Sequence, residues 1–223
     1  MNPIYRSIIN LDWITLILAL SLLLLSLGKY FFRSSFFNFI ILPFNNKYIT
    51  LHKKKGKLFQ GFHIIMCIFQ MANLALFIFV AQNLFQKQPL DVYSDFYLII
   101  IAGLLLYFLV KIGLQIGNGY FFENPGLMTA LIFEKLSYFN YGGLIAFMGN
   151  ILVIYVFPGS ITIIYVVILL LLIMNGIGIV KILRNLQKLI VSHTFYFILY
   201  LCTLEISPIA IIISYLNSWN IWK

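Results

Sequence analysis

Long runs of apolar residues, separated by short polar stretches, organise the whole chain of 223 residues. A run of roughly 18 or more apolar residues can cross the ~30 Å hydrocarbon core of a bilayer as an α-helix. Six such runs can be placed, and most of them are joined by short loops. We therefore predict an all-α integral membrane protein in which residues 1–223 form a single polytopic transmembrane domain. The predicted spans cover about residues 9 to 28, 62 to 84, 95 to 116, 139 to 157, 160 to 181 and 190 to 214.

Two segments between the spans are predicted to lie at the membrane surface. Residues 29–60 mix aromatic residues with lysines, so the rings can sink toward acyl chains while the ammonium groups meet headgroups. This segment is predicted to be a basic cytoplasmic interfacial loop. Residues 124–137 begin with Asn124-Pro125, an N-cap residue followed by proline at the first helical position. This segment is too short to span a bilayer, so we predict that it forms a short interfacial helix.

Composition and charge support the same class of protein. A chain that is 62% hydrophobic and 9% charged, with a mean hydropathy of +1.00, has too much apolar surface for a soluble globular domain. The net charge of +9 comes from 15 Lys and Arg residues, most of which fall on one side of the predicted topology. The positive-inside rule then places residues 29–60 in the cytoplasm and both termini outside.

The basic run in this loop is the first candidate interaction surface. Attraction of Lys53, Lys54, Lys55 and Lys57 to anionic lipid headgroups explains the charge without nucleic acid, which we do not expect as a partner. A role limited to setting the topology is the simpler interpretation. A docking surface for a protein partner is the alternative.

Glu205 is the most unusual residue, because it is a carboxylate well inside the last apolar run. Such a group must be neutralised, paired or hydrated, and it is therefore a candidate functional residue. His193 and Tyr200 belong to a polar stripe on the same helix, and Glu205 points away from that stripe. Pro208 frees the carbonyl group of Leu204 and should kink the helix. Glu205 could bind a proton or a cation there, contact another subunit, or hydrogen-bond a neighbouring helix, and the structural role is favoured.

Other chemistry is weakly supported. His63 and His193 begin two spans at similar depth, which makes a metal or haem pair thinkable, but no third ligand is evident. Cys67 and Cys202 lie inside spans, so a disulfide is not expected. No phosphate-binding loop, dinucleotide fingerprint, hydrolase or metalloprotease motif is present in the sequence. An enzyme is disfavoured, and no cofactor or metal site is predicted.

The stretch from Phe195 to Pro208 resembles the C-terminal signature of a family of bacterial integral membrane proteins, and Asn45-Asn46-Lys47-Tyr48 is also similar to it. That family, found mainly in Bacteroidota, is known as a domain of unknown function. The resemblance implies a multi-pass protein of the bacterial inner membrane, with periplasmic termini under the predicted topology. It implies no activity and no catalytic residue.

Three functions follow as hypotheses. The first is a non-enzymatic accessory or scaffold subunit of an inner-membrane complex, which binds other membrane subunits or a second copy of itself. The second is a small proton- or cation-coupled transporter that uses Glu205. The third is a lipid-modifying enzyme acting near His63 and His193. A scaffold should tolerate Glu205→Gln, whereas a coupled carrier should not.

Overall fold

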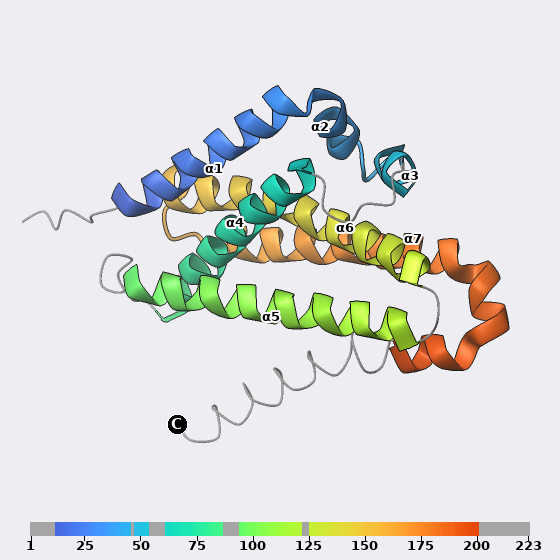
Figure 1. The fold of residues 1–223 in the computed structure, drawn as a ribbon. Helices are drawn as coiled ribbons and strands as arrows, with labels where there is room; N and C mark the ends of the chain where they lie inside the picture. Colours follow the sequence, from blue (N-terminus) through green and yellow to red (C-terminus); the bar gives the residue numbers. More distant parts are fainter. Residues whose placement is uncertain (1–11, 46, 54–60, 87–93, 122–124, 201–223) are drawn as a thin grey trace, which may run out of the picture.

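All regular elements in the described part of the chain are helices, as a computed structural model of the protein shows (Figure 1). The structure describes residues 12–45, 47–53, 61–86, 94–121 and 125–200. The helices are α1 (Asp12–Phe31), α2 (Arg33–Ile40), α3 (Lys47–Lys53), α4 (Gly61–Gln86), α5 (Ser94–Phe121), α6 (Pro125–Ile151), the π-helical turn η1 (Leu152–Val156) and α7 (Ile161–Tyr200).

Five of these helical segments are long and apolar enough to cross a membrane. They are Asp12–Phe31, Gly61–Gln86, Phe96–Leu114, Thr129–Val156 and Ile161–Lys181. The prediction of an all-α membrane protein is therefore confirmed, and its first five spans coincide with helices. The sixth predicted span, 190 to 214, begins within α7 and continues outside the described residues.

Two helices extend beyond their predicted boundaries. The segment predicted as a separate short helix, 124 to 137, forms the first half of α6, which runs without interruption from Pro125 to Ile151. No proline or glycine follows Gly126 until Gly142, and the Ser137 hydroxyl donates a hydrogen bond to the Phe133 carbonyl oxygen (2.7 Å) within the helix. A serine that bonds back to its own helix need not end it.

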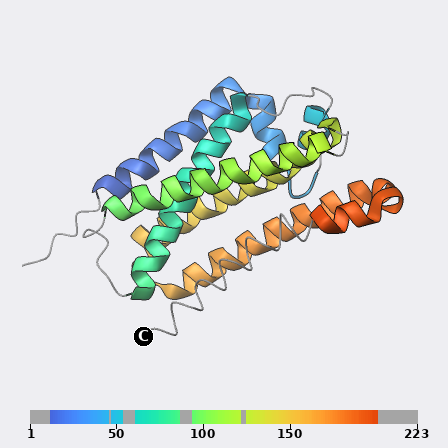
Figure 2. The same cartoon turned by 60° about the horizontal axis from the view of Figure 1, so that its bottom comes forward.

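α7 is also longer than predicted, because no helix break separates residues 181 and 190. The sequence offers neither glycine nor proline between Gly178 and Tyr200 to stop the helix. Its 40 residues would reach ~60 Å if straight, about twice the thickness of the hydrocarbon core. In both views the C-terminal part of α7 changes direction and turns back (Figures 1 and 2).

The core is built around α4, which packs against α1, α5, α6 and α7. Apolar side chains such as Phe69, Leu76 and Phe79 are fully buried on it. The Asn73 amide nitrogen donates to the Ser21 hydroxyl of α1 (3.1 Å), and that of Asn150 on α6 donates to the Asn73 carbonyl oxygen (3.0 Å). Hydrogen bonds of buried amides thus connect α1, α4 and α6. Each hydrogen bond of this kind stabilises a membrane helix bundle by a modest ~0.6 kcal/mol.

Small residues let α6 and α7 approach each other closely. A Cβ atom on Gly149 would lie 2.6 Å from Val167, and one on Gly178 would lie 2.8 Å from the Tyr138 ring. The turn between η1 and α7 uses Gly159, whose φ of 78° suits glycine. α6 and α7 therefore form a tight antiparallel hairpin.

The segment predicted as an interfacial loop, 29–60, is partly helical. It contains the end of α1, the short helices α2 and α3, and a turn through Pro43. Phe39 and Tyr48 are buried against Phe62 and Phe133, with ring centroids 5.5–6.1 Å apart for the contacts of Tyr48. Burial raises the pKa of the Tyr48 phenol above its ordinary value, with a smaller contribution from Cys67. The described part of this segment, residues 29–45 and 47–53, is therefore folded onto one end of the bundle through an aromatic cluster.

Candidate functional site

Polar side chains gather at the end of the bundle that carries α2 and α3. We refer to Glu134, Tyr138, Lys181 and His63 as the polar cluster. Glu134 of α6 is 0% exposed, and it acts electrostatically on Tyr138 of the same helix and on Lys181 of α7. A carboxylate in such a place is stable only with charged or hydrogen-bonding neighbours. Lys181 of the adjacent helix is one such charged neighbour.

Lys181 joins this cluster to the folded 29–60 segment. Its ammonium group donates hydrogen bonds to the carbonyl oxygens of Pro43 (3.1 Å) and Leu42 (3.4 Å), where the chain turns after α2. It also lies 5.4 Å from the centre of the Tyr138 ring, within cation–π range. One lysine therefore links α7, α6 and the segment before α3.

His63 lies on the α4 side of the same region. It is 1% exposed, and its ring centre is 4.7 Å from that of Phe133. Nearby, the Asn140 amide donates to the Cys67 sulfur (3.3 Å). Among the described residues, no group of three His, Cys, Asp or Glu side chains could hold a metal ion. The buried His63 ring therefore packs on Phe133 as an aromatic side chain does.

A cavity of about 440 Å³ opens beside this cluster, between α5, α6 and α7. The charged side chains that line it, within the described part of the chain, are Lys111 of α5 and Lys135 of α6. Lys111 donates to the Tyr107 hydroxyl (3.2 Å), and the two lysines lie close enough to repel each other. Tyr138 and Asn175 add polar groups to walls that are otherwise apolar.

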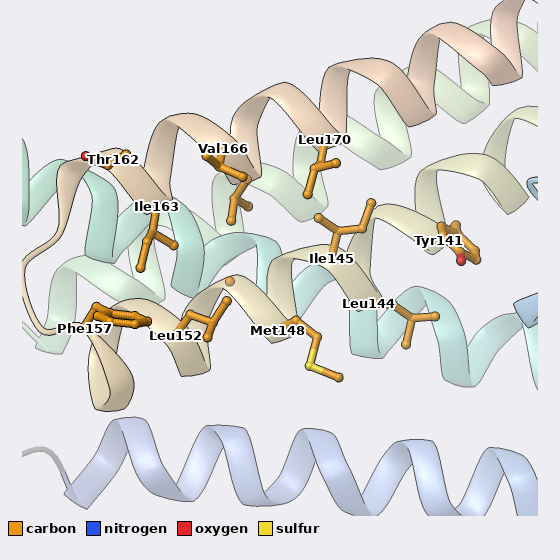
Figure 3. Close-up of a pocket in the computed structure, with 12 residues that line it drawn as sticks. Tyr141, Leu144, Ile145, Met148, Leu152, Phe157, Thr162, Ile163, Val166 and Leu170 are labelled. Carbon is orange, nitrogen blue, oxygen red and sulfur yellow. The ribbon is translucent and has the colours of Figure 1, made fainter.

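A second cavity, of about 460 Å³, lies between α6, η1 and α7 and differs in chemistry. Figure 3 shows Ile145 and Leu152 on the side of Ile163, Val166 and Leu170, while the Met148 side chain points away from α7. Tyr141 and Thr162 are the polar side chains in its lining. An apolar groove of this kind suits an acyl chain or an apolar side chain.

Most of the chain matches one known protein family. The family model described as "Domain of unknown function (DUF4271)" matches residues 14–216. The chain belongs to the DUF4271 family. No curated protein and no solved structure matches it. The expected family is thus confirmed, and the function of this DUF4271 protein has to be inferred from its own geometry.

Most of the residues predicted from sequence fall outside the residues that the structure describes. Glu205 and Pro208, like Lys54, Lys55 and Lys57, fall outside the described residues of this DUF4271 protein. Lys53 is the last residue of α3. His193 and Tyr200 lie on the C-terminal part of α7, and Tyr200 is its last residue.

Sequence reasoning missed the residues that the structure does bring together. Glu134 and Lys135 fall within the predicted interfacial helix, residues 124–137, and Lys111 and Lys181 fall within predicted spans, with no role predicted for any of them beyond the charge of the chain. A signal was available, since Glu134 and Tyr138 are four residues apart and so share a helix face. Recognising it required α6 to be read as one continuous helix.

Proposed function

We propose that this DUF4271 protein is a non-enzymatic accessory or scaffold subunit of a complex in the bacterial inner membrane, and that α5 binds a transmembrane helix of a partner. The supporting observation is an open face of small residues on α5. This face is free of packing inside the described structure, whereas Gly149 and Gly178 of the α6–α7 hairpin are covered.

α5 is the least buried of the five candidate spans. A Cβ atom added at Gly103, Gly113 or Gly117 would meet no atom of the described structure within 4 Å. At ~100° per residue, these glycines fall within an arc of about 80° and extend over ~21 Å of helix. Exposed Ala102, Leu106 and Val110 lie in or beside the same arc.

Small residues spaced in this way allow two helix backbones to approach closely in a membrane, where packing rather than the hydrophobic effect drives association. Gly149 and Gly178 already serve this purpose inside the molecule, because an added Cβ would collide with Val167 or Tyr138. The corresponding surface of α5 has room for a second helix. That difference favours a partner-binding role for α5.

The proposed orientation rests on charge. Lys111 and Lys135 share one cavity, and Lys181 binds the turn after α2, so all three lie at the end that carries the basic 29–60 segment. The positive-inside rule would place this end in the cytoplasm and both termini in the periplasm. Lysines 53, 54, 55 and 57 would then face the anionic headgroups of the inner leaflet.

Co-purification from native membranes tests the proposal. Gently solubilised wild-type protein should carry the same polypeptides in every preparation, and the double change Gly113→Leu and Gly117→Leu should remove them while the chain stays folded. Ala19→Leu is the matched control, because Ala19 of α1 is also an exposed small residue on a candidate span. If wild-type protein is isolated alone, or if all variants keep the same partners, the scaffold proposal fails.

One observation favours the alternative of an ion-coupled transporter. The side-chain oxygens of Gln70, Asn73 and Asn150 are buried and have no hydrogen-bond partner in the described part of the chain. Oxygens of this kind can bind a cation. In proteoliposomes, a carrier should drive Na⁺ or proton uptake that Glu205→Gln abolishes, whereas a scaffold should show no uptake and should keep its partners with this change.

A further inference from the structure

The cavity between α5, α6 and α7 has the features of a binding site that the scaffold role does not explain. It encloses about 440 Å³ and is reached from the surface past Tyr107, Leu172 and Ile179, which are 38%, 65% and 43% exposed. α5 and α7 both pack on α6, so α6 forms the floor and the other two helices form the walls. The opening therefore faces the space that lipid occupies around the spans.

The charge in this cavity is of one sign. Lys111 and Lys135 are the charged residues of its described lining, and they repel each other. The buried acid of this region, Glu134, acts on Lys181 and Tyr138. Burial also disfavours the charged form of Lys135, and an anion placed between the two lysines would favour the ammonium form of both.

The remaining lining is suited to hydrocarbon. Phe108, Ile112, Leu136, Phe139 and Leu172 supply most of the wall beyond the lysines. The hydroxyls of Tyr107 and Tyr138 and the amide of Asn175 also line the cavity and can contact an ester or glycerol oxygen. A ligand that fits both parts is an amphiphile with a phosphate headgroup.

We propose that this cavity binds an anionic phospholipid, with its phosphate between Lys111 and Lys135 and an acyl chain along the apolar wall formed by α5, α6 and α7. The phosphate would lie at the end of the spans where the positive-inside rule places the cytoplasmic leaflet. Free inorganic phosphate shares the anionic chemistry but cannot use the apolar wall. The lipid assignment therefore predicts that both parts of the cavity contribute to binding.

Lipid binding to the full-length, delipidated protein in detergent tests this assignment. Dioleoylphosphatidylglycerol should bind and raise the melting temperature, whereas zwitterionic dioleoylphosphatidylcholine and inorganic phosphate should bind much more weakly. Lys111→Gln should weaken phosphatidylglycerol binding about fivefold or more, the effect expected for one basic residue near an anionic headgroup. The control Lys29→Gln removes an exposed lysine in the last turn of α1, which lies next to α2. This change should leave phosphatidylglycerol binding within about twofold of wild type.

A second variant tests the apolar part without changing the charge. Gly176 lines the cavity, and an added Cβ would meet no atom within 4 Å, so Gly176→Leu should fill space there without disturbing the bundle. It should weaken phosphatidylglycerol binding without lowering the lipid-free melting temperature. Equal binding of the two lipids, or equal losses from Lys29→Gln and Lys111→Gln, would overturn the site. Stabilisation by inorganic phosphate as strong as that by phosphatidylglycerol, with no effect of Gly176→Leu, would overturn the lipid assignment.

Discussion

Replacing two glycines of α7 with alanine separates close packing from helix propensity. Gly176 and Gly178 are two residues apart on the same helix, but an added Cβ meets open space at Gly176 and lies 2.8 Å from the Tyr138 ring at Gly178. Both changes improve helix propensity by a similar ~1 kcal/mol, so this contribution cancels when the variants are compared. Overpacking typically costs about 1–3 kcal/mol, and Gly178→Ala should be less stable than Gly176→Ala by this amount.

Thermal unfolding in one detergent at one pH measures the difference. For a chain of this size, each kcal/mol corresponds to roughly 2–4 °C in melting temperature, so Gly178→Ala should melt about 2–12 °C below Gly176→Ala. Circular dichroism should show the same helix content before melting in both variants. Equal melting temperatures, or a more stable Gly178→Ala, would show that Gly178 does not pack against Tyr138 and would refute the described α6–α7 interface.

Two further predictions concern the folded 29–60 segment. Lys181→Met removes hydrogen bonds to the carbonyls of Leu42 and Pro43, each worth about 2 kcal/mol for a charged donor, so hydrogen exchange should accelerate in α2 while α4 stays protected. Unchanged exchange in α2 would argue against this link. Because burial raises the pKa of Tyr48, its folded form keeps the proton where the unfolded form loses it, so stability falls as the pH rises above ~10, by up to ~1.4 kcal/mol per pH unit. Tyr48→Phe should lose less stability than wild type between pH 9 and about pH 11 in thermal melts, and equal losses would contradict the burial of this phenol.

The five spans could be predicted because hydrophobic length alone separates a membrane helix from a loop. The continuity of α6 could not, since Ser137 and the charged pair Glu134-Lys135 resemble the end of a surface helix. Only the structure shows that Glu134 is buried and that the Ser137 hydroxyl bonds back to Phe133. Local sequence cannot reveal which neighbouring helix compensates a charge.

The candidate site was harder to predict than the fold for the same reason. Lys111 and Lys135 are 24 residues apart in the sequence and meet only because α5 and α6 pack side by side. Lys181 finds its partners in a turn almost 140 residues earlier. Pattern and spacing identify contacts within a helix, whereas these contacts depend on how the helices pack.

Site-specific photo-cross-linking in native membranes tests most directly whether α5 binds a partner helix. A photoreactive residue at Val110, which is 54% exposed and lies among the α5 glycines, should cross-link to one reproducible polypeptide. The same group at Leu169 of α7, which is 58% exposed, should give no such product. Cross-links to lipid alone at Val110, or the same products from both positions, would contradict the proposal that this DUF4271 protein is a scaffold that uses α5.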